Sequence, residues 1–188
     1  MTTFVLFAIA VVAVVGGVAL FHLFPALKTY FAYRGKRIIT CPETHQKAAV
    51  EVAAGTAAAT VLWGDPRLRL DRCSRWPERQ TCGQECLQQI EADPENCLLW
   101  NIVSNWYQGK KCFFCHKPFA RMQHLDHPPA LLGPDRRITE WKQFQPEEIF
   151  KILAKYQPVC WNCHIVETFR RVHPELVVER NRDIHTVV

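Results

Sequence analysis

The sequence predicts an α+β fold, with one N-terminal transmembrane helix followed by a small domain of short hairpins and helices. Three observations predict it: an uncharged apolar stretch opens the chain, short apolar segments bounded by turn residues follow, and nine cysteines lie beyond residue 40. At 188 residues, the chain is long enough for one compact domain, or two very small ones, plus an appendage. Its 48% hydrophobic and 22% charged residues exclude intrinsic disorder and collagen-like or low-complexity chains.

The N-terminal segment is long enough to cross a bilayer. Residues 4–21 carry no charge and no strongly polar side chain, and residues 23–27 extend the apolar stretch. A secretory signal peptide would begin with basic residues and end at a small-x-small cleavage site, and residues 16–27 offer no good site of this kind. The alternative is a buried core helix, which rarely stays uncharged on every face over such a length. We therefore expect an uncleaved anchor over residues 1–27.

Residues 28–37 form a basic and aromatic juxtamembrane segment. Its aromatic rings suit the lipid headgroup layer, and its four cations suit anionic lipid: Lys28, Arg34, Lys36 and Arg37. The positive-inside bias places the N-terminus outside and residues 38–188 in the cytoplasm of a single-pass membrane protein. Since residues 1–40 contain no acid, most of the net charge of +5 lies here. The remainder is nearly neutral, which argues against nucleic-acid binding.

Hydrophobic patterning divides the soluble part into two subdomains, residues 38–108 and 109–178, and a tail, residues 179–188. In the first we expect a hairpin around residues 37–41 and 48–52, a strand leading into Cys73, and helices over residues 82–91 and 98–106. In the second we expect a hairpin over residues 130–141, a helix over residues 146–156 and a last helix over residues 163–172.

The strongest chemical signal is a pair of Cys-x-x-Cys motifs, Cys112/Cys115 and Cys160/Cys163. The two-residue gap lets both sulfurs of a pair reach one ion, and four thiolates in a tetrahedron suit zinc best. A reducing compartment would also favour metal over disulfides. Residues 110–173 resemble a treble-clef zinc finger, in which a Cys-x-x-Cys knuckle like Cys112 to Phe119 is followed by a hairpin, and a helix supplies the second pair. The helix expected over residues 147–156 departs from that pattern.

A rival interpretation is attachment of two c-type haems. Each Cys-x-x-Cys pair is followed by a histidine, His116 or His164, and Cys-x-x-Cys-His is the c-type haem signature. This similarity to c-type cytochromes implies a dihaem electron carrier facing the periplasm, with those histidines as axial ligands. Sixth ligands could come from His124, His127, His173 or Met122. A third interpretation is a reactive thiol pair, Cys112/Cys115.

The other five cysteines predict a second centre. Cys82 and Cys86 are four residues apart, which would place them on one face of the expected helix, and Cys41 and Cys73 each end an expected strand. We expect these four to hold a second zinc ion, with buried free thiols as the alternative. Cys97 could replace Cys41 as a ligand or pack beneath the helix that follows it. In an extracytoplasmic domain these cysteines could instead form disulfides.

Other polar residues give weaker signals. His124 and His127, with Asp126 between them, could form a metal or acid–base pair, although such a loop is more often only solvated. Arg170, Arg171 and His173 form a small basic face on the last helix, which could be a docking patch, although such a face is more often only solvated. The sequence holds no phosphate-binding Gly loop, no Gly-x-Ser-x-Gly and no His-Glu-x-x-His, so we expect neither an enzyme nor a small-molecule substrate.

The whole chain also resembles uncharacterised membrane-anchored proteins that carry Cys-Pro-Glu-Thr near the anchor, here residues 41–44, and Pro-Val-Cys-Trp-Asn-Cys-His near the end, here residues 158–164. This resemblance implies no activity. The expected function is therefore a membrane-anchored structural zinc protein, acting as an accessory or docking subunit of a membrane complex. Its expected partners are lipid and other membrane subunits, which small residues such as Ala13 and Gly17 would let approach the anchor.

Overall fold

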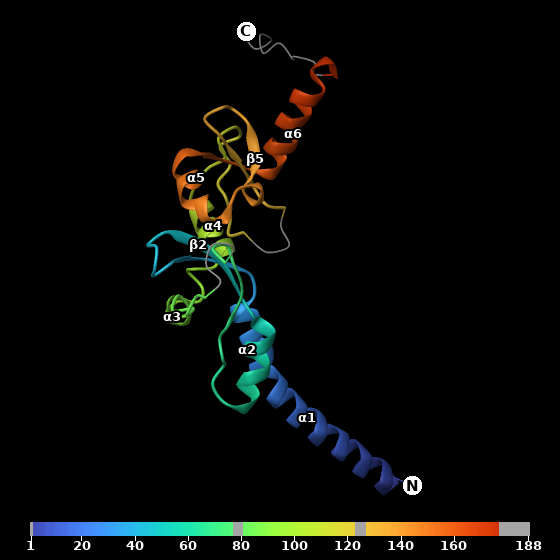
Figure 1. The fold of residues 1–188 in the computed structure, drawn as a ribbon. Helices are drawn as coiled ribbons and strands as arrows, with labels where there is room; N and C mark the ends of the chain where they lie inside the picture. The colour runs from blue at the N-terminus through green and yellow to red at the C-terminus, as the bar shows by residue number, and fades with distance from the viewer. Residues whose placement is uncertain (1, 77–80, 123–126, 177–188) are drawn as a thin grey trace. The chain divides into compact units, whose positions relative to one another are not determined.

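The computed structural model describes residues 2–76, 81–122 and 127–176 (Figure 1). The chain divides into two compact units, residues 1–103 and residues 104–188. Both units combine helices with short strands, so the expected mixture of α and β structure is confirmed.

The first element is a long apolar helix, α1 (Thr2–Tyr33). No part of its apolar stretch is buried inside the protein, which excludes the expected alternative of a core helix. By length and composition α1 is able to cross a membrane, and an N-terminal signal sequence would share these properties.

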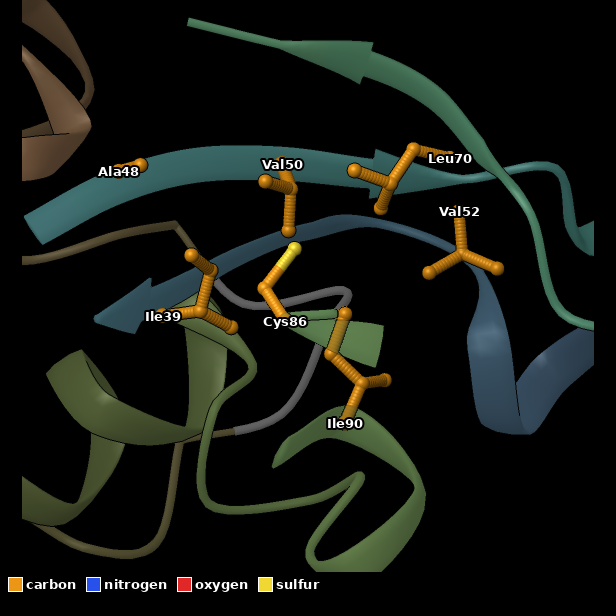
Figure 2. Packing of buried hydrophobic residues seen from close by; sticks show 7 residues of the cluster. All are labelled: Ile39, Ala48, Val50, Val52, Leu70, Cys86 and Ile90. Carbon is orange, nitrogen blue, oxygen red and sulfur yellow. The ribbon is translucent and has the colours of Figure 1, made fainter. Parts of the chain in front are cut away.

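The sheet of the first unit is antiparallel, in the order β1 (Lys36–Thr40), β2 (Lys47–Val52) and β3 (Leu70–Cys73). The expected hairpin is confirmed, since Ile38 pairs with Ala49 and Thr40 with Lys47. The core is made by alternate sheet residues together with Cys86 and with Ile90 of α3 (Leu87–Ala92) (Figure 2).

Two further helical segments belong to the first unit. α2 (Ala54–Thr60) continues into the 3₁₀ helix η1 (Val61–Trp63), and both pack against α1. Their Ala-rich sequence does not alternate apolar and polar residues at helical spacing, so hydrophobic patterning does not predict these helices. The helix expected over residues 98–106 is confirmed as α4 (Leu99–Tyr107), at whose Val103 the first unit ends.

The structure corrects one expected helix. α3 begins at Leu87, so Cys82 and Cys86 precede it and do not share a helical face. The cause is Gln84, which has φ +59° and whose Oε1 accepts a hydrogen bond of 2.9 Å from the backbone N–H of Leu70. A non-glycine residue held in the left-handed region interrupts a helix at that point.

Arg37 does not face lipid, contrary to expectation. Its side chain is fully buried, and its guanidinium donates to the backbone carbonyls of Tyr33 (2.6 Å), Gly35 (3.1 Å) and Ala32. These carbonyls belong to the last turn of α1 and the residues after it, which lack partners within the helix. Arg37 therefore caps the C-terminal end of α1, where a positive charge also interacts favourably with the helix dipole.

The sheet of the second unit has the order β5 (Ile138–Glu140), β4 (Ala130–Leu132) and β6 (Gln157–Val159), all antiparallel. The expected hairpin over residues 130–141 is confirmed. Strand β6 was not predicted, because it has three residues and contains a proline. The helices are η2 (Trp141–Gln143), η3 (Pro146–Glu148), α5 (Ile149–Lys155), α6 (Trp161–Val172) and η4 (Pro174–Leu176).

Candidate metal centre

Four cysteines of the second unit converge as the sequence predicted. The sulfur atoms of Cys112, Cys115, Cys160 and Cys163 all lie within 4.8 Å of one another. The Sγ atoms of Cys115 and Cys160 are 3.7 Å apart. Such a cluster could hold a metal ion. The coarser prediction, that these four residues form one potential metal site, is therefore confirmed.

The first pair lies on a tight turn closed by backbone hydrogen bonds. The N–H of Cys112 donates to the carbonyl of Lys117 (2.9 Å), and the N–H of His116 donates to the carbonyl of Cys112 (3.0 Å). The N–H groups of Phe114 and Cys115 point at the sulfur of Cys112. His116 closes the turn with φ +58°, in the left-handed region that histidine visits more readily than most residues. This turn aims both sulfurs to the same side.

The second pair is positioned by β6 and α6. Cys160 is the N-cap residue of α6 and Cys163 lies in its first turn, so the helix fixes the separation of the two sulfurs. Helix α6 begins at Trp161, two residues before the start expected at Cys163. Two bonds join the pairs: the N–H of Phe113 donates to the carbonyl of Pro158 (2.8 Å), and the N–H of Cys160 approaches Cys112 Sγ at 3.3 Å.

The cysteine cluster packs against a small apolar core formed by residues of the sheet. Cys112 and Val159 are fully buried and pack with Leu132 and with the partly buried Phe119 and Ile138. Behind them, the hydroxyl of the buried Tyr107 donates to the carbonyl of Ala130 (2.8 Å). Cys115, in contrast, is exposed. The site is thus held by a packed sheet on one side and is open to solvent on the other.

The thiols differ in their tendency to ionise. Burial alone would raise the pKa of Cys112, but hydrogen bonds from the backbone N–H groups of Cys115, Cys160 and Phe114 lower it to about 7. Burial raises the pKa values of Cys160 and Cys163, and the neighbouring thiols of Cys112 and Cys115 add to the rise. Several thiolates this close repel one another, so full ionisation of the cluster requires a bound cation.

The histidines of the haem interpretation lie outside this cluster. The side chain of His116 is exposed, and the ring of His164 packs edgewise on Trp161. Of the suggested sixth ligands, His127 stacks on Trp161 with ring centroids 4.8 Å apart, and His173 Nδ1 lies 3.3 Å from a carboxylate oxygen of Glu175. His124 and Asp126 lie outside the described residues, so the predicted pair with His127 has no structural description.

The second predicted set, Cys41, Cys73, Cys82 and Cys86, lines one small pocket of the first unit. Within the described residues, no three of these four sulfurs meet the 4.8 Å separation of the first cluster. Cys97 does not line this pocket, and its Sγ lies 3.5 Å from the carbonyl of Pro94.

No family model, curated protein or solved structure matches this chain. The function is therefore inferred from the chemistry of the chain's own residues.

Proposed function

We propose that the protein is a membrane-anchored metalloprotein in which Cys112, Cys115, Cys160 and Cys163 hold a structural zinc ion. The observation that carries this proposal is the 3.7 Å between the sulfurs of Cys115 and Cys160. In a tetrahedron with Zn–S bonds of about 2.3 Å, neighbouring sulfurs are about 3.8 Å apart. This separation matches that of a four-thiolate zinc site, and all four sulfurs lie within 4.8 Å of one another.

The donor set favours a structural role over a catalytic one. Four soft thiolates in a tetrahedral arrangement are typical of zinc, and a site whose four positions are all filled by protein has no place for water or substrate. The ion would tie the turn at Cys112 to the start of α6. It would thereby stabilise a unit whose strands have only three residues each.

The same geometry weighs against two c-type haems. Haem attachment uses each Cys-x-x-Cys-His motif separately, with one macrocycle for each pair of thiols. Here the thiols of both motifs meet in one cluster, and the N–H of Cys160 points at the sulfur of Cys112. One ion shared by both pairs accounts for this convergence, whereas two separate haems do not.

The anchor is proposed from the surface of α1. Large apolar side chains are exposed on α1 between Phe4 and Phe31, with exposures of 84% for Phe4 and 71% for Val12. Soluble proteins rarely expose an apolar surface of this size, and lipid is the solvent that it matches. The basic residue Lys28 lies near the end of α1, and Arg34 and Lys36 follow it. This position of the basic residues favours a cytoplasmic location for the soluble part.

A docking role is proposed from α6. One face of this helix exposes Ile165, Val166 and Phe169, each close to half exposed, and Val172 extends it. A patch of this kind on a small protein is typical of a protein-interaction site. We therefore propose an accessory or docking subunit of a membrane complex, whose partner covers this face of α6.

Two experiments test the proposal. Alkaline carbonate should leave the full-length protein in the membrane pellet, and a variant with Val14→Arg and Val15→Arg should be extracted. A photo-crosslinking residue at Phe169 should trap a membrane-protein partner in intact cells, and one at the exposed Lys151 of α5 should not. Extraction of the unmodified protein would contradict the anchor. Equal labelling from both positions would contradict the docking face.

A further inference from the structure

The first unit repeats the turn that carries Cys112, at Cys41. The N–H of Cys41 donates to the carbonyl five residues ahead, that of Gln46 (2.8 Å), as Cys112 does to Lys117. The N–H of His45 donates back to the carbonyl of Cys41 (2.8 Å), as His116 does to Cys112. His45 has φ +54°, the counterpart of His116 at +58°. In sequence the two turns share only the first cysteine and this histidine.

The likeness extends to position 44. Thr44 lies three residues after Cys41, as Cys115 lies three residues after Cys112. Thr44 therefore occupies the position of the second knuckle cysteine, and the turn presents one sulfur where the turn at Cys112 presents two.

Three further cysteines face the Cys41 turn across one pocket. Cys73 ends β3, Cys82 lies in the following loop, and Cys86 lies immediately before α3 with its sulfur directed toward the sheet (Figure 2). The N–H of Gln84 points at Cys82 Sγ (3.4 Å), as backbone N–H groups do in the first centre. The pocket encloses about 50 Å³, which is enough for an ion and far below the size of an organic ligand site.

The side chains around this pocket favour a soft metal ion. Four cysteines line it, and thiolate is the ligand that zinc prefers. The sulfurs are more widely spaced than in the first cluster. Rotation of cysteine side chains between staggered positions is the movement that would bring them onto one ion.

We propose that Cys41, Cys73, Cys82 and Cys86 form a second, independent zinc site, built on a copy of the Cys112 turn in which Thr44 replaces the second cysteine. This site lies in the first unit and shares no residue with the cluster at Cys112. It joins the β1–β2 turn, the end of β3 and the loop before α3 into one structure. Cys97 is not a ligand.

The test is zinc content per chain in the full-length protein purified in detergent under reducing conditions. We expect about two zinc ions in the unmodified protein and about one in Cys82→Ser. The matched control Cys97→Ser should keep two. The decisive variant is Cys82→Ser combined with Thr44→Cys, which should return to two, because position 44 then supplies the missing sulfur as Cys115 does in the other turn.

Three outcomes would overturn the second site. The first is one zinc per chain in both the unmodified protein and Cys82→Ser. The second is a disulfide between any two of the four cysteines in the native protein. The third is that the double variant keeps the first zinc and does not regain the second. Retention of the first zinc shows that the second unit remains folded. Cys115→Ser changes a ligand of the first centre only, so its zinc content tests that centre. The two sites are therefore tested separately.

Discussion

The sulfur atoms of Cys115 and Cys160 lie 3.7 Å apart although 45 residues separate them along the chain. Cys115 ends a turn closed by local hydrogen bonds, and Cys160 caps α6. Between them the chain forms the β4–β5 hairpin, α5 and β6, and β6 returns beside β4. The sheet therefore brings the two local motifs to one point.

Replacement of a ligand should remove the metal and unfold the second unit. We expect Cys112→Ser and Cys163→Ser each to lose the zinc of this centre and at least about 5 kcal/mol of stability, since a structural zinc site supplies much of the folding free energy of a small domain. Limited proteolysis and zinc analysis of the full-length protein measure both effects. The control is His116→Asn, at an exposed position where asparagine tolerates the same left-handed backbone. Normal metal content and protease resistance in Cys163→Ser would refute the four-ligand site.

Zinc binding to the metal-free protein should release protons. Because the pKa values of Cys160 and Cys163 are raised, both thiols hold a proton at pH 7 and lose it when they bind zinc. We expect at least about two protons per ion from this pair, and a further fraction from Cys112 that falls as the pH rises through about 7. Calorimetric titration of the Cys41→Ser variant, in buffers of different ionisation enthalpy, measures the number. A release near zero would mean that these thiols are not the ligands.

Loss of one buried hydroxyl should weaken the second unit without touching the cysteines. Tyr107→Phe removes the hydrogen bond to the carbonyl of Ala130, in a place that water does not reach. We expect a loss of about 1 to 3 kcal/mol in the free energy of unfolding with zinc content unchanged. Tyr30→Phe, on the exposed surface of α1, is the matched control and should change it by less than about 0.5 kcal/mol. Equal effects of the two substitutions would show that this hydrogen bond adds no stability.

Removal of the buried cation at the end of α1 should loosen the junction between α1 and β1. Arg37→Met leaves the carbonyls of Ala32, Tyr33 and Gly35 without their donor, and we expect a loss of about 2 to 4 kcal/mol. Hydrogen exchange followed by mass spectrometry should show faster exchange over residues 34–40. Lys36→Met, one residue earlier and exposed, serves as the control. Unchanged exchange in Arg37→Met would show that the cap is not needed.

The sequence predicts those features that depend on neighbouring residues. Cys-x-x-Cys spacing and strand alternation are local, and they correctly indicated the cluster at Cys112 and the β1–β2 hairpin. The burial of Arg37 and the interruption at Gln84 were not predictable in this way. In the sequence, Arg37 is one of four basic residues with the same local character. The conformation of Gln84 depends on its hydrogen bond with Leu70, fourteen positions away. The similarity of the Cys41 and Cys112 turns could not be predicted from the sequence either, because the turns share backbone conformation and hydrogen bonds and few residues.

The most direct test of the central claim is elemental analysis for zinc and iron on the purified full-length protein, with a visible absorption spectrum of the same sample. We predict a colourless protein whose zinc falls by about one ion per chain in Cys115→Ser and is unaffected by His116→Asn. Haem absorption together with iron and no zinc would contradict it, because each Cys-x-x-Cys-His motif would then carry its own haem.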